Sequence, residues 1–371
     1  MKKKQLHYFT EGNTAKGFVS FRESNTSGLE TLYIVSGMPG AGKSTFIKKL
    51  CDFCVASGFS PENIHNINDN NTLSGIVVPE LKLGIFDDAV GITPSSIYEL
   101  KHIDLNLCLN QKLLYENQQA AKIHFDQKSQ ALNLAYNAFA EGLLLHCEAE
   151  EIYINNLYRS KADAITKALL SEIIPESKLN KISVVRKRFL GAATYEGVVD
   201  YIESLTFDNS ARYLIKGRPG TGKSTMLKQI AAHAMQKGYD VDYYHCGLDP
   251  DSLDMVTIRE LGLSVFDSTQ PHEHFPQKNS DKIIDMYAAA VKPHTDEKYA
   301  EILHDISAKY KKYIKRGISY LAEAKEANDA IKHLFAPTVN HDHLNEITEN
   351  TIDEISRNTN FLVTPADCGR Y

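Results

Sequence analysis

The sequence predicts an α/β fold that is built twice along the chain. Three observations lead to this prediction: a glycine-rich pattern occurs twice, the residues around it recur with it, and strand-like runs alternate with helix-like runs in both copies. Strands that alternate with helices favour a parallel sheet with right-handed crossovers. We therefore expect two parallel sheets, each with flanking helices.

The glycine-rich pattern G-x-x-x-x-G-K-S occupies residues 37–44 and 217–224, between a β-type run and a helix-compatible run both times. This is the P-loop pattern, whose glycines let backbone N–H groups surround phosphate oxygens. Its lysine reaches the β/γ-phosphates, and its serine hydroxyl binds Mg²⁺. The sequence thus predicts two tandem P-loop NTPase domains. The expected nucleotide-binding residues are Gly37, Pro39, Gly40, Ala41, Gly42, Lys43, Ser44 and Thr45 in the first loop, and Gly217, Arg218, Pro219, Gly220, Thr221, Gly222, Lys223, Ser224 and Thr225 in the second.

The two loops belong to a longer repeat. Lys43 and Lys223 lie 180 positions apart, and the same offset aligns further residues over about eighty positions, which indicates that a whole unit was duplicated. The matched pairs include Phe9 with Phe189, His65 with His245, Asp69 with Asp249, and Asp87 with Asp267. We divide the chain into a first domain, 1–180, and a second, 181–371.

Each copy is expected to run strand, loop, helix, strand, short loop and strand, followed by a long helical stretch. In the first copy the strands are expected at 32–35, 63–67 and 83–86, and the helix from Lys43 to about Ala56. Residues 95–171 and 280–334 contain few glycines and prolines and many helix-forming residues. We expect each stretch to form an appended helical hairpin, packed beside its sheet or against the other copy.

Metal binding is predicted at the ends of two buried strands. A Mg²⁺-nucleotide site needs a carboxylate opposite the loop serine, and the apolar runs that end in Asp87 and Asp267 supply one at the same distance from both loops. The predicted metal ligands are therefore Ser44 and Asp87 in the first copy and Ser224 and Asp267 in the second. Asp88 could orient an attacking water in the first copy, whereas Ser268 cannot in the second, so we expect the two sites to be inequivalent.

Other candidate catalytic groups are Lys43 and Lys223, which face the phosphates, and Asp69 and Asp249, which follow the second predicted strand. The two aspartates could accept a proton from an acceptor hydroxyl, or they could be turn residues, since Asn70 and Pro250 follow them. Arg218 could reach the nucleotide of the other copy, or it could be a solvated arginine or a contact to its own phosphates.

Composition restricts the class of protein. A net charge of −6 disfavours a nucleic-acid platform, and no apolar stretch has transmembrane length, so we expect a cytoplasmic protein without membrane contact. Apolar residues make up 43% and charged residues 24%, as in globular proteins. The guanine-reading N-K-x-D motif has no convincing match, so ATP is the default nucleotide.

The paired loops, the segments 78–81 and 259–261, and the runs 267–273, 281–287 and 296–301 resemble a family of bacterial tandem P-loop ATP-binding proteins. The likeness covers nearly the whole chain. It implies ATP binding and a duplicated P-loop fold, and it implies no particular substrate. The run 87–93 departs from the family, which tends to have a D-G-T-A-P-H type sequence there.

We expect a Mg²⁺-dependent ATP-binding protein that hydrolyses ATP slowly and uses the bound state to set the arrangement of its halves. One alternative is a kinase that phosphorylates a small hydroxylated metabolite or a nucleotide, with Asp69 or Asp249 as base. A second is a non-hydrolysing scaffold, stabilised by nucleotide, whose helical appendages recruit a protein partner. Fold alone does not separate the three.

Overall fold

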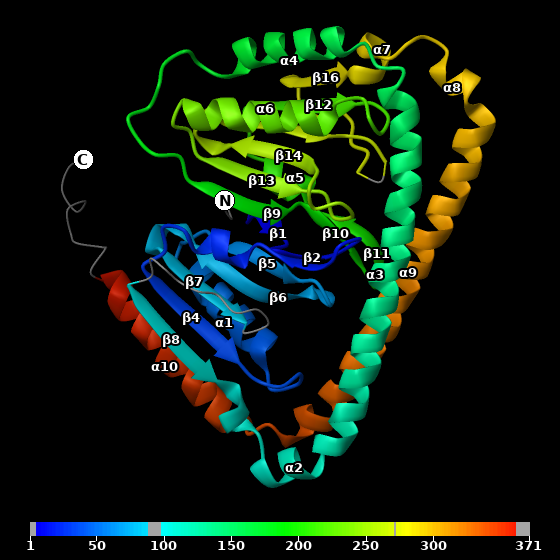
Figure 1. Cartoon of the computed structure of the whole chain (residues 1–371). Coiled ribbons are helices and arrows are strands. Elements are labelled where there is room, and N and C mark those ends of the chain that lie inside the picture. The colour runs from blue at the N-terminus through cyan, green and yellow to red at the C-terminus, as the bar shows by residue number, and fades with distance from the viewer. Residues whose placement is uncertain (1–4, 88–97, 271, 361–371) are drawn as a thin grey trace, which may run out of the picture.

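The computed structural model describes residues 5–87, 98–270 and 272–360 of the 371-residue chain. It is an α/β structure with one six-stranded mixed sheet in each half and a pair of very long helices along one side (Figure 1). None of the helices in the described part of the chain has the length and apolarity that a membrane span requires.

The two sheets have the same strand order. In the first it is β1 (His7–Tyr8), β5 (Glu62–Asn66), β6 (Asp69–Val78), β7 (Leu83–Asp87), β4 (Thr31–Ser36) and β8 (Glu99–Asp104). In the second it is β9 (Val185–Phe189), β13 (Val241–His245), β14 (Leu253–Ile258), β15 (Leu263–Asp267), β12 (Ala211–Lys216) and β16 (Asp281–Asp285).

The expected parallel sheets are mostly parallel, but the expectation was wrong at one strand in each half. Strands β6 and β14 run antiparallel to both of their neighbours, and the other pairings are parallel. The reason is local: short turns join β5 to β6 and β6 to β7, and such connections reverse the chain. The turn from β6 to β7 contains the 3-10 helix η2 (Pro79–Leu81), followed by Lys82 at positive φ. The equivalent turn from β14 to β15 contains η4 (Arg259–Leu261), followed by Gly262 at positive φ.

The helices that follow the glycine-rich loops are α1 (Lys43–Ala56) and α6 (Lys223–Gln236), and the predicted start and end of α1 are confirmed. Each packs apolar residues at helical spacing against one face of its sheet. In α1 these residues are Phe46, Ile47, Leu50, Cys51 and Cys54. The opposite faces of the two sheets join in a single apolar cluster that includes Leu32 and Phe86 from the first half and Leu214 and Phe266 from the second.

Equivalent elements of the two halves meet in the middle of the molecule. The hairpins β2 (Glu11–Thr14) with β3 (Gly17–Ser20) and β10 (Gly191–Thr194) with β11 (Gly197–Asp200) lie there, near the short helices η1 (Arg22–Thr26) and α5 (Ile202–Thr206). Buried Glu62 accepts hydrogen bonds from Arg188 and Arg259, both at 2.8 Å. Burial alone would raise the pKa of Glu62, but these guanidinium groups lower it to about 2.

The expected helical hairpins take a different form. The stretch 95–171 contains β8, η3 (Leu105–Cys108), α2 (Gln111–Glu116), α3 (Gln118–Ile154) and α4 (Arg159–Ile173). The second stretch contains β16, α7 (Met286–Ala290), α8 (Thr295–Lys298) and α9 (Ala300–Phe335), with η5 (Ala336–Thr338) and α10 (His341–Asn360) following. Helices α3 and α9 lie side by side and antiparallel, so each half contributes one member of the pair (Figure 1).

Small residues permit this close pairing. A methyl group at Gly317 of α9 would lie 2.3 Å from the ring of Phe139, and one at Gly142 of α3 would lie 3.1 Å from Ile314. The pair therefore packs through glycines at the point where the helices cross the boundary between the halves.

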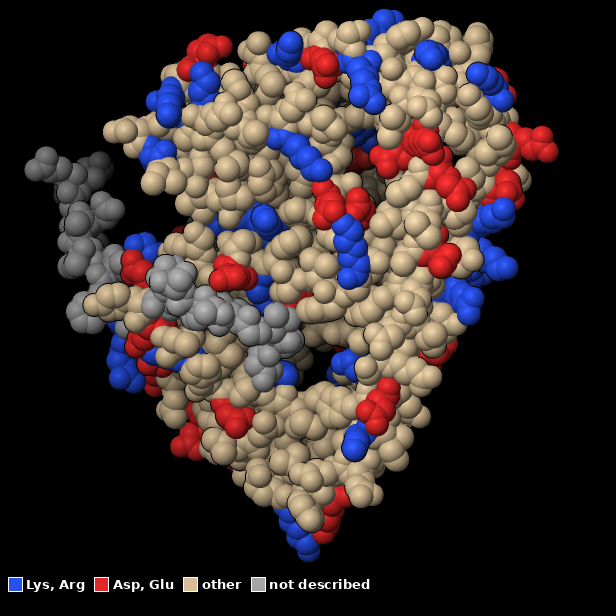
Figure 2. All heavy atoms as spheres, in the orientation of Figure 1, with Lys and Arg blue, Asp and Glu red and all other residues tan. Residues whose placement is uncertain are grey.

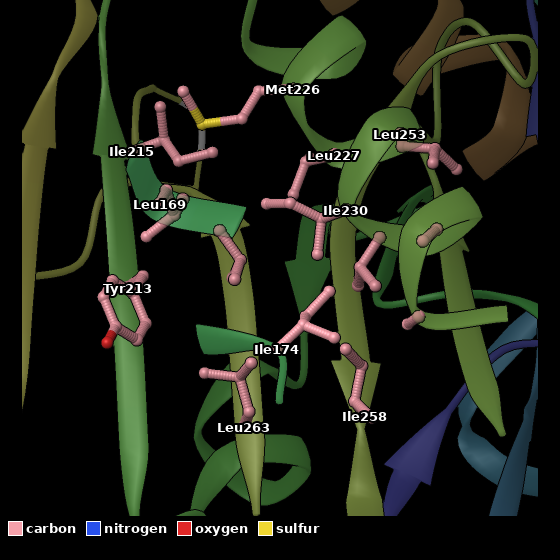
Figure 3. Close-up of a cluster of buried hydrophobic side chains, with 14 of the residues drawn as sticks. Leu169, Ile174, Tyr213, Ile215, Met226, Leu227, Ile230, Leu253, Ile258 and Leu263 are labelled. Carbon is pink, nitrogen blue, oxygen red and sulfur yellow. The ribbon is translucent and has the colours of Figure 1, made fainter. Parts of the chain in front are cut away.

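The helices that follow the long pair are exchanged between halves. Helix α4 of the first half packs on the second sheet. Leu169 of α4, and Ile174 directly after the helix, lie among side chains of β12, β15 and α6 (Figure 3). Helix α10 of the second half packs on the first sheet, where Leu344 is buried and Glu354 accepts a hydrogen bond from Tyr33 at 2.9 Å. Neither sheet is fully covered by helices of its own half.

Candidate functional site

The second glycine-rich loop, residues 217–225, joins β12 to α6. Gly220 and Gly222 have φ values of 74° and 89°, a region that favours glycine over other residues. A methyl group at Gly220 would lie 2.4 Å from the carbonyl oxygen of Glu150 on α3. The loop conformation and the contact with a helix of the other half both therefore require glycine at position 220.

Lys223 and Ser224 begin α6 and lie at the inner side of this loop. The Nζ atom of Lys223 donates to the carbonyl oxygens of Gly217 at 3.3 Å and Arg218 at 2.8 Å, so the side chain folds back over its own loop. The Oγ atom of Ser224 accepts a hydrogen bond from the backbone N–H of Leu253 at 3.0 Å. The predicted lysine and serine are thus together at the start of the helix.

Asp267 ends β15, the strand next to β12. Ile215 pairs with Asp267 in the parallel ladder, which brings the carboxylate to the edge of the sheet where the loop begins. One carboxylate oxygen of Asp267 accepts hydrogen bonds from the N–H and hydroxyl of Thr269, and the other lies 3.5 Å from Nζ of Lys223. The sequence prediction that Asp267 lies beside the second loop is consistent with this geometry.

Asp254 is a second carboxylate at the same edge, and it is not among the residues predicted from the sequence. Its residue is 8% exposed, and its Oδ2 atom has no hydrogen-bond partner among the described residues. Burial raises the pKa of Asp254 to about 6, with His272 acting against this shift and Asp267 adding to it. The sequence did contain a signal for this residue, because the second copy has a charged Asp254 at the position where the first copy has the neutral Ser74.

A large cavity opens on this loop. Its volume is about 1820 Å³, and its walls come from both halves: the loop and Asp254, Asp267 and His272 from the second, and α3 with His146 and Tyr153 from the first. Helix α9 forms a further side with His304 and Tyr310. In the space-filling view, acidic side chains gather beside a hollow between the second half and the long helices (Figure 2).

Arg218 points to a carboxylate of its own half. Its guanidinium donates to Asp296 of α8 at 2.6 Å, and Asp296 also accepts from the hydroxyl of Tyr153 on α3 at 2.8 Å. Of the alternatives for Arg218, the structure thus favours a place beside its own loop over a reach toward the other one.

Asp249, one of the candidate bases, lines the cavity but also caps a turn. Its carboxylate accepts hydrogen bonds from the N–H of Asp251 at 3.2 Å and the hydroxyl of Ser252 at 2.8 Å. Its counterpart Asp69 accepts from Lys332 of α9 at 2.8 Å and lies 3.6 Å from Lys325. Both aspartates already have partners, and those of Asp69 come from the other half.

The first glycine-rich loop, residues 37–45, is covered by elements of the second half. A methyl group at Gly40 would lie 2.8 Å from the carbonyl oxygen of Lys332, and one at Gly42 would lie 2.9 Å from the side chain of Leu344 on α10. At the matching position of the second loop, a methyl group on Gly222 would meet nothing nearer than Met286 at 3.7 Å. The side chain of Lys43 donates to the carbonyl oxygen of Gly37, as Lys223 does to Gly217.

Asp87, the predicted metal ligand of the first half, lies in a buried ion cluster. Its carboxylate pairs with Arg22 at 2.5 Å, and Arg22 also pairs with Glu11 at 2.8 Å. The side chain of Arg22 is 1% exposed, and that of Asp87 is 7% exposed. The second half has Ile202 and Gly191 where Arg22 and Glu11 stand, so it has no such cluster. Asp88 lies outside the described residues.

Two carboxylates share one guanidinium in this cluster. Burial raises the pKa of Glu11 to about 7; Arg22 acts against this shift, and the Asp87 charge adds to it. The sequence could not reveal the cluster, because Arg22 and Asp87 are far apart along the chain and belong to no common pattern.

His272 and His274, the residues on either side of Glu273, pair with Asp200 of β11 at 3.0 and 3.4 Å. In residues 5–87, 98–270 and 272–360, no group of three or more His, Cys, Asp or Glu side chains is arranged to hold a metal ion by itself. Mg²⁺ is commonly held by one or two carboxylates together with substrate phosphates, so Ser224 and Asp267 fit such a cation only in company with a phosphate ligand.

In comparisons with known proteins, no family model matches this chain, and no curated protein or solved structure matches it either.

Proposed function

We propose that this chain binds a nucleoside triphosphate, by default ATP, with Mg²⁺ at the second loop and hydrolyses it slowly. The observation that supports the proposal most strongly is the cavity of about 1820 Å³ into which the loop, Lys223 and Asp267 all face. The paired P-loop sequences and the resemblance to tandem P-loop ATP-binding proteins point to the same ligand.

The residues have distinct expected roles. Backbone N–H groups of the loop and the ammonium group of Lys223 would bind the β- and γ-phosphates, helped by the positive end of α6. Ser224 and Asp267 would hold Mg²⁺, which supplies positive charge next to the phosphates. The glycines at 220 and 222 support this reading, because any side chain there would be strained.

The first loop is proposed to contribute little to hydrolysis. Its strand-end carboxylate, Asp87, is paired with buried Arg22, and the loop itself is covered by Lys332 and Leu344. Leu344 of α10 lies against Gly42 of the first loop, whereas at the equivalent Gly222 the nearest side chain, Met286, is farther away and the second loop faces a cavity. The two loops are thus inequivalent, as expected from the sequence, but in the opposite direction: Asp88 favoured hydrolysis in the first copy, and Ser268 disfavoured it in the second.

Contacts between loops and long helices support coupling of the nucleotide state to the arrangement of the halves. The second loop touches Glu150 of α3, and the first loop touches Lys332 of α9. Each loop therefore lies against a helix that runs into the other half. A ligand that changes the second loop would act directly on α3, and through its contacts on α9.

Phosphoryl transfer to a second substrate is the main alternative. Pockets for small ligands usually measure about 300–1,000 Å³, so a cavity of about 1820 Å³ leaves room for an acceptor beside a nucleotide. Asp249 and the missed carboxylate Asp254 both line the cavity and could accept a proton from a hydroxyl.

Phosphate release from ATP with Mg²⁺ tests the proposal. Release that is unaffected by metabolite pools supports the ATPase, transfer of labelled phosphate to a metabolite supports the kinase, and tight binding without turnover supports the scaffold. Lys223→Ala should lower turnover by at least about tenfold, since a hydrogen bond to a charged group contributes about 1.5–3 kcal/mol. Lys43→Ala is the matched control and should retain most of the turnover; the opposite ranking would contradict the proposal.

A further inference from the structure

Asp254 is an unusual residue to find in the wall of the cavity. A buried carboxylate oxygen without a hydrogen-bond partner costs free energy, and native structures seldom keep one unless something compensates for it. The residue is 8% exposed, and its Oδ2 atom lacks a hydrogen-bond partner among the described residues. A ligand in the cavity could reach this residue, since Asp254 lines it.

Asp254 and Asp267 lie at the same edge of the second sheet. Strands β14 and β15 are antiparallel, and Met255 pairs with Phe266. Asp254 and Asp267 are the next residues beyond that pair, so both leave the ladder on the side of the second loop. Facing residues on neighbouring strands have Cβ atoms about 4.5–5.5 Å apart, close enough for two carboxylates to share one cation.

The first half offers a comparison within the same chain. There Gly75 pairs with Phe86, and the next residues are Ser74 and Asp87. Ser74 donates to the carbonyl oxygen of His65, and Asp87 is paired with Arg22. The equivalent edge of the first sheet thus has one carboxylate, already neutralised by a buried guanidinium, where the second has two that face a cavity.

We propose that Asp254 and Asp267 together hold the divalent cation of the nucleotide at the second loop, and that Ser74 and Asp87, at the same positions of the first half, do not form an equivalent cation site. This inference rests on the proposed function. It adds a ligand, Asp254, to the pair Ser224 and Asp267, and it accounts for an unpartnered oxygen that packing leaves unexplained.

Calorimetry of a non-hydrolysable ATP analogue, with Mg²⁺ and separately with EDTA, tests the inference on the full chain. In the parent protein Mg²⁺ should strengthen binding. Asp254→Asn keeps the size of the side chain and removes its charge, so the strengthening by Mg²⁺ should fall by about tenfold or more, while binding in EDTA stays equal or improves. Ser74→Ala is the matched control in the first half and should leave both affinities unchanged.

The outcomes separate this inference from the proposed function. If Asp254→Asn keeps the full Mg²⁺ effect, or loses affinity equally with Mg²⁺ and with EDTA, Asp254 does not bind the cation, although the nucleotide site stands. If the analogue does not bind the parent protein under either condition, the proposed function fails and this inference fails with it. Asp254→Ser, which installs the residue of the first half, provides a second variant should the asparagine disturb the fold.

Discussion

The backbone N–H of Phe9 donates to the carbonyl oxygen of Phe189 at 3.1 Å, and the N–H of Phe189 donates to the carbonyl oxygen of Phe9 at 2.8 Å. These residues occupy equivalent positions in the two copies, so the halves meet through a self-complementary contact, as in a two-fold dimer. The exchange of α4 and α10 has the same symmetry. The two halves thus share their strand order and the exchange of one helix, whereas the side chains around the two loops differ.

The contact of the second loop with α3 gives a first prediction. Gly220→Ala places a methyl group 2.4 Å from the carbonyl oxygen of Glu150 and strains a residue at φ 74°. Gly17→Ala strains a residue at φ 89° but meets nothing within 4 Å, so it isolates the backbone effect. In urea unfolding, Gly17→Ala should lower the free energy of unfolding by roughly 1–2 kcal/mol, and Gly220→Ala should lower it measurably more. Equal losses would show that α3 yields freely at this point.

The crossing of the long helices gives a second prediction. Gly317→Ala would drive a methyl group to 2.3 Å from the buried ring of Phe139, so overpacking should cost roughly 1–3 kcal/mol. Gly142→Ala meets only the end of Ile314 at 3.1 Å and gains helix propensity of up to about 1 kcal/mol, so it should be neutral or stabilising. Thermal melts of both variants check the ranking; a reversed ranking would contradict the described packing.

The buried cluster of Arg22 with Glu11 and Asp87 predicts a pH dependence. The pKa of Glu11 is raised to about 7, so the folded protein binds a proton there that the unfolded chain releases near its ordinary value of 4.5. This group's contribution to stability is therefore fully present below about 4.5 and is lost as the pH rises to about 7. Glu11→Gln should remove this loss. Its free energy of unfolding should therefore rise above that of the parent protein by roughly 1–3 kcal/mol between about pH 5 and pH 8.

Urea unfolding of both proteins at several pH values measures this difference. Glu99→Gln is a suitable control, because Glu99 is partly exposed and pairs with Lys101 at the surface. A constant difference between parent and Glu11→Gln over the whole range would mean that Glu11 stays ionised beside Arg22.

The repeat let the sequence predict most elements that surround the loops. The helix 43–56 was placed correctly, and the strands before the loops and at Asp87 and Asp267 were found because apolar runs recur at a fixed offset. The reversed strand β6 was missed because its first half is polar and its second half contains Gly75, and both weaken the strand pattern.

Long-range features could not be read from one sequence. Apolar periodicity shows that α3 and α9 are helices, but it does not identify the partner of either helix, and the exchange of α4 and α10 leaves no local signal. Asp254 could have been noticed as a charge that replaces Ser74 in the repeat. The pairing of Asp87 with Arg22 could not, since it depends on tertiary packing.

Calorimetric titration with Mg²⁺ and a non-hydrolysable ATP analogue measures nucleotide binding at the second loop. We predict one strong Mg²⁺-dependent site per chain, weakened about 10- to 100-fold by Lys223→Ala and nearly unchanged by Lys43→Ala. Absence of binding to the parent protein, or equal weakening by the two substitutions, would contradict the account.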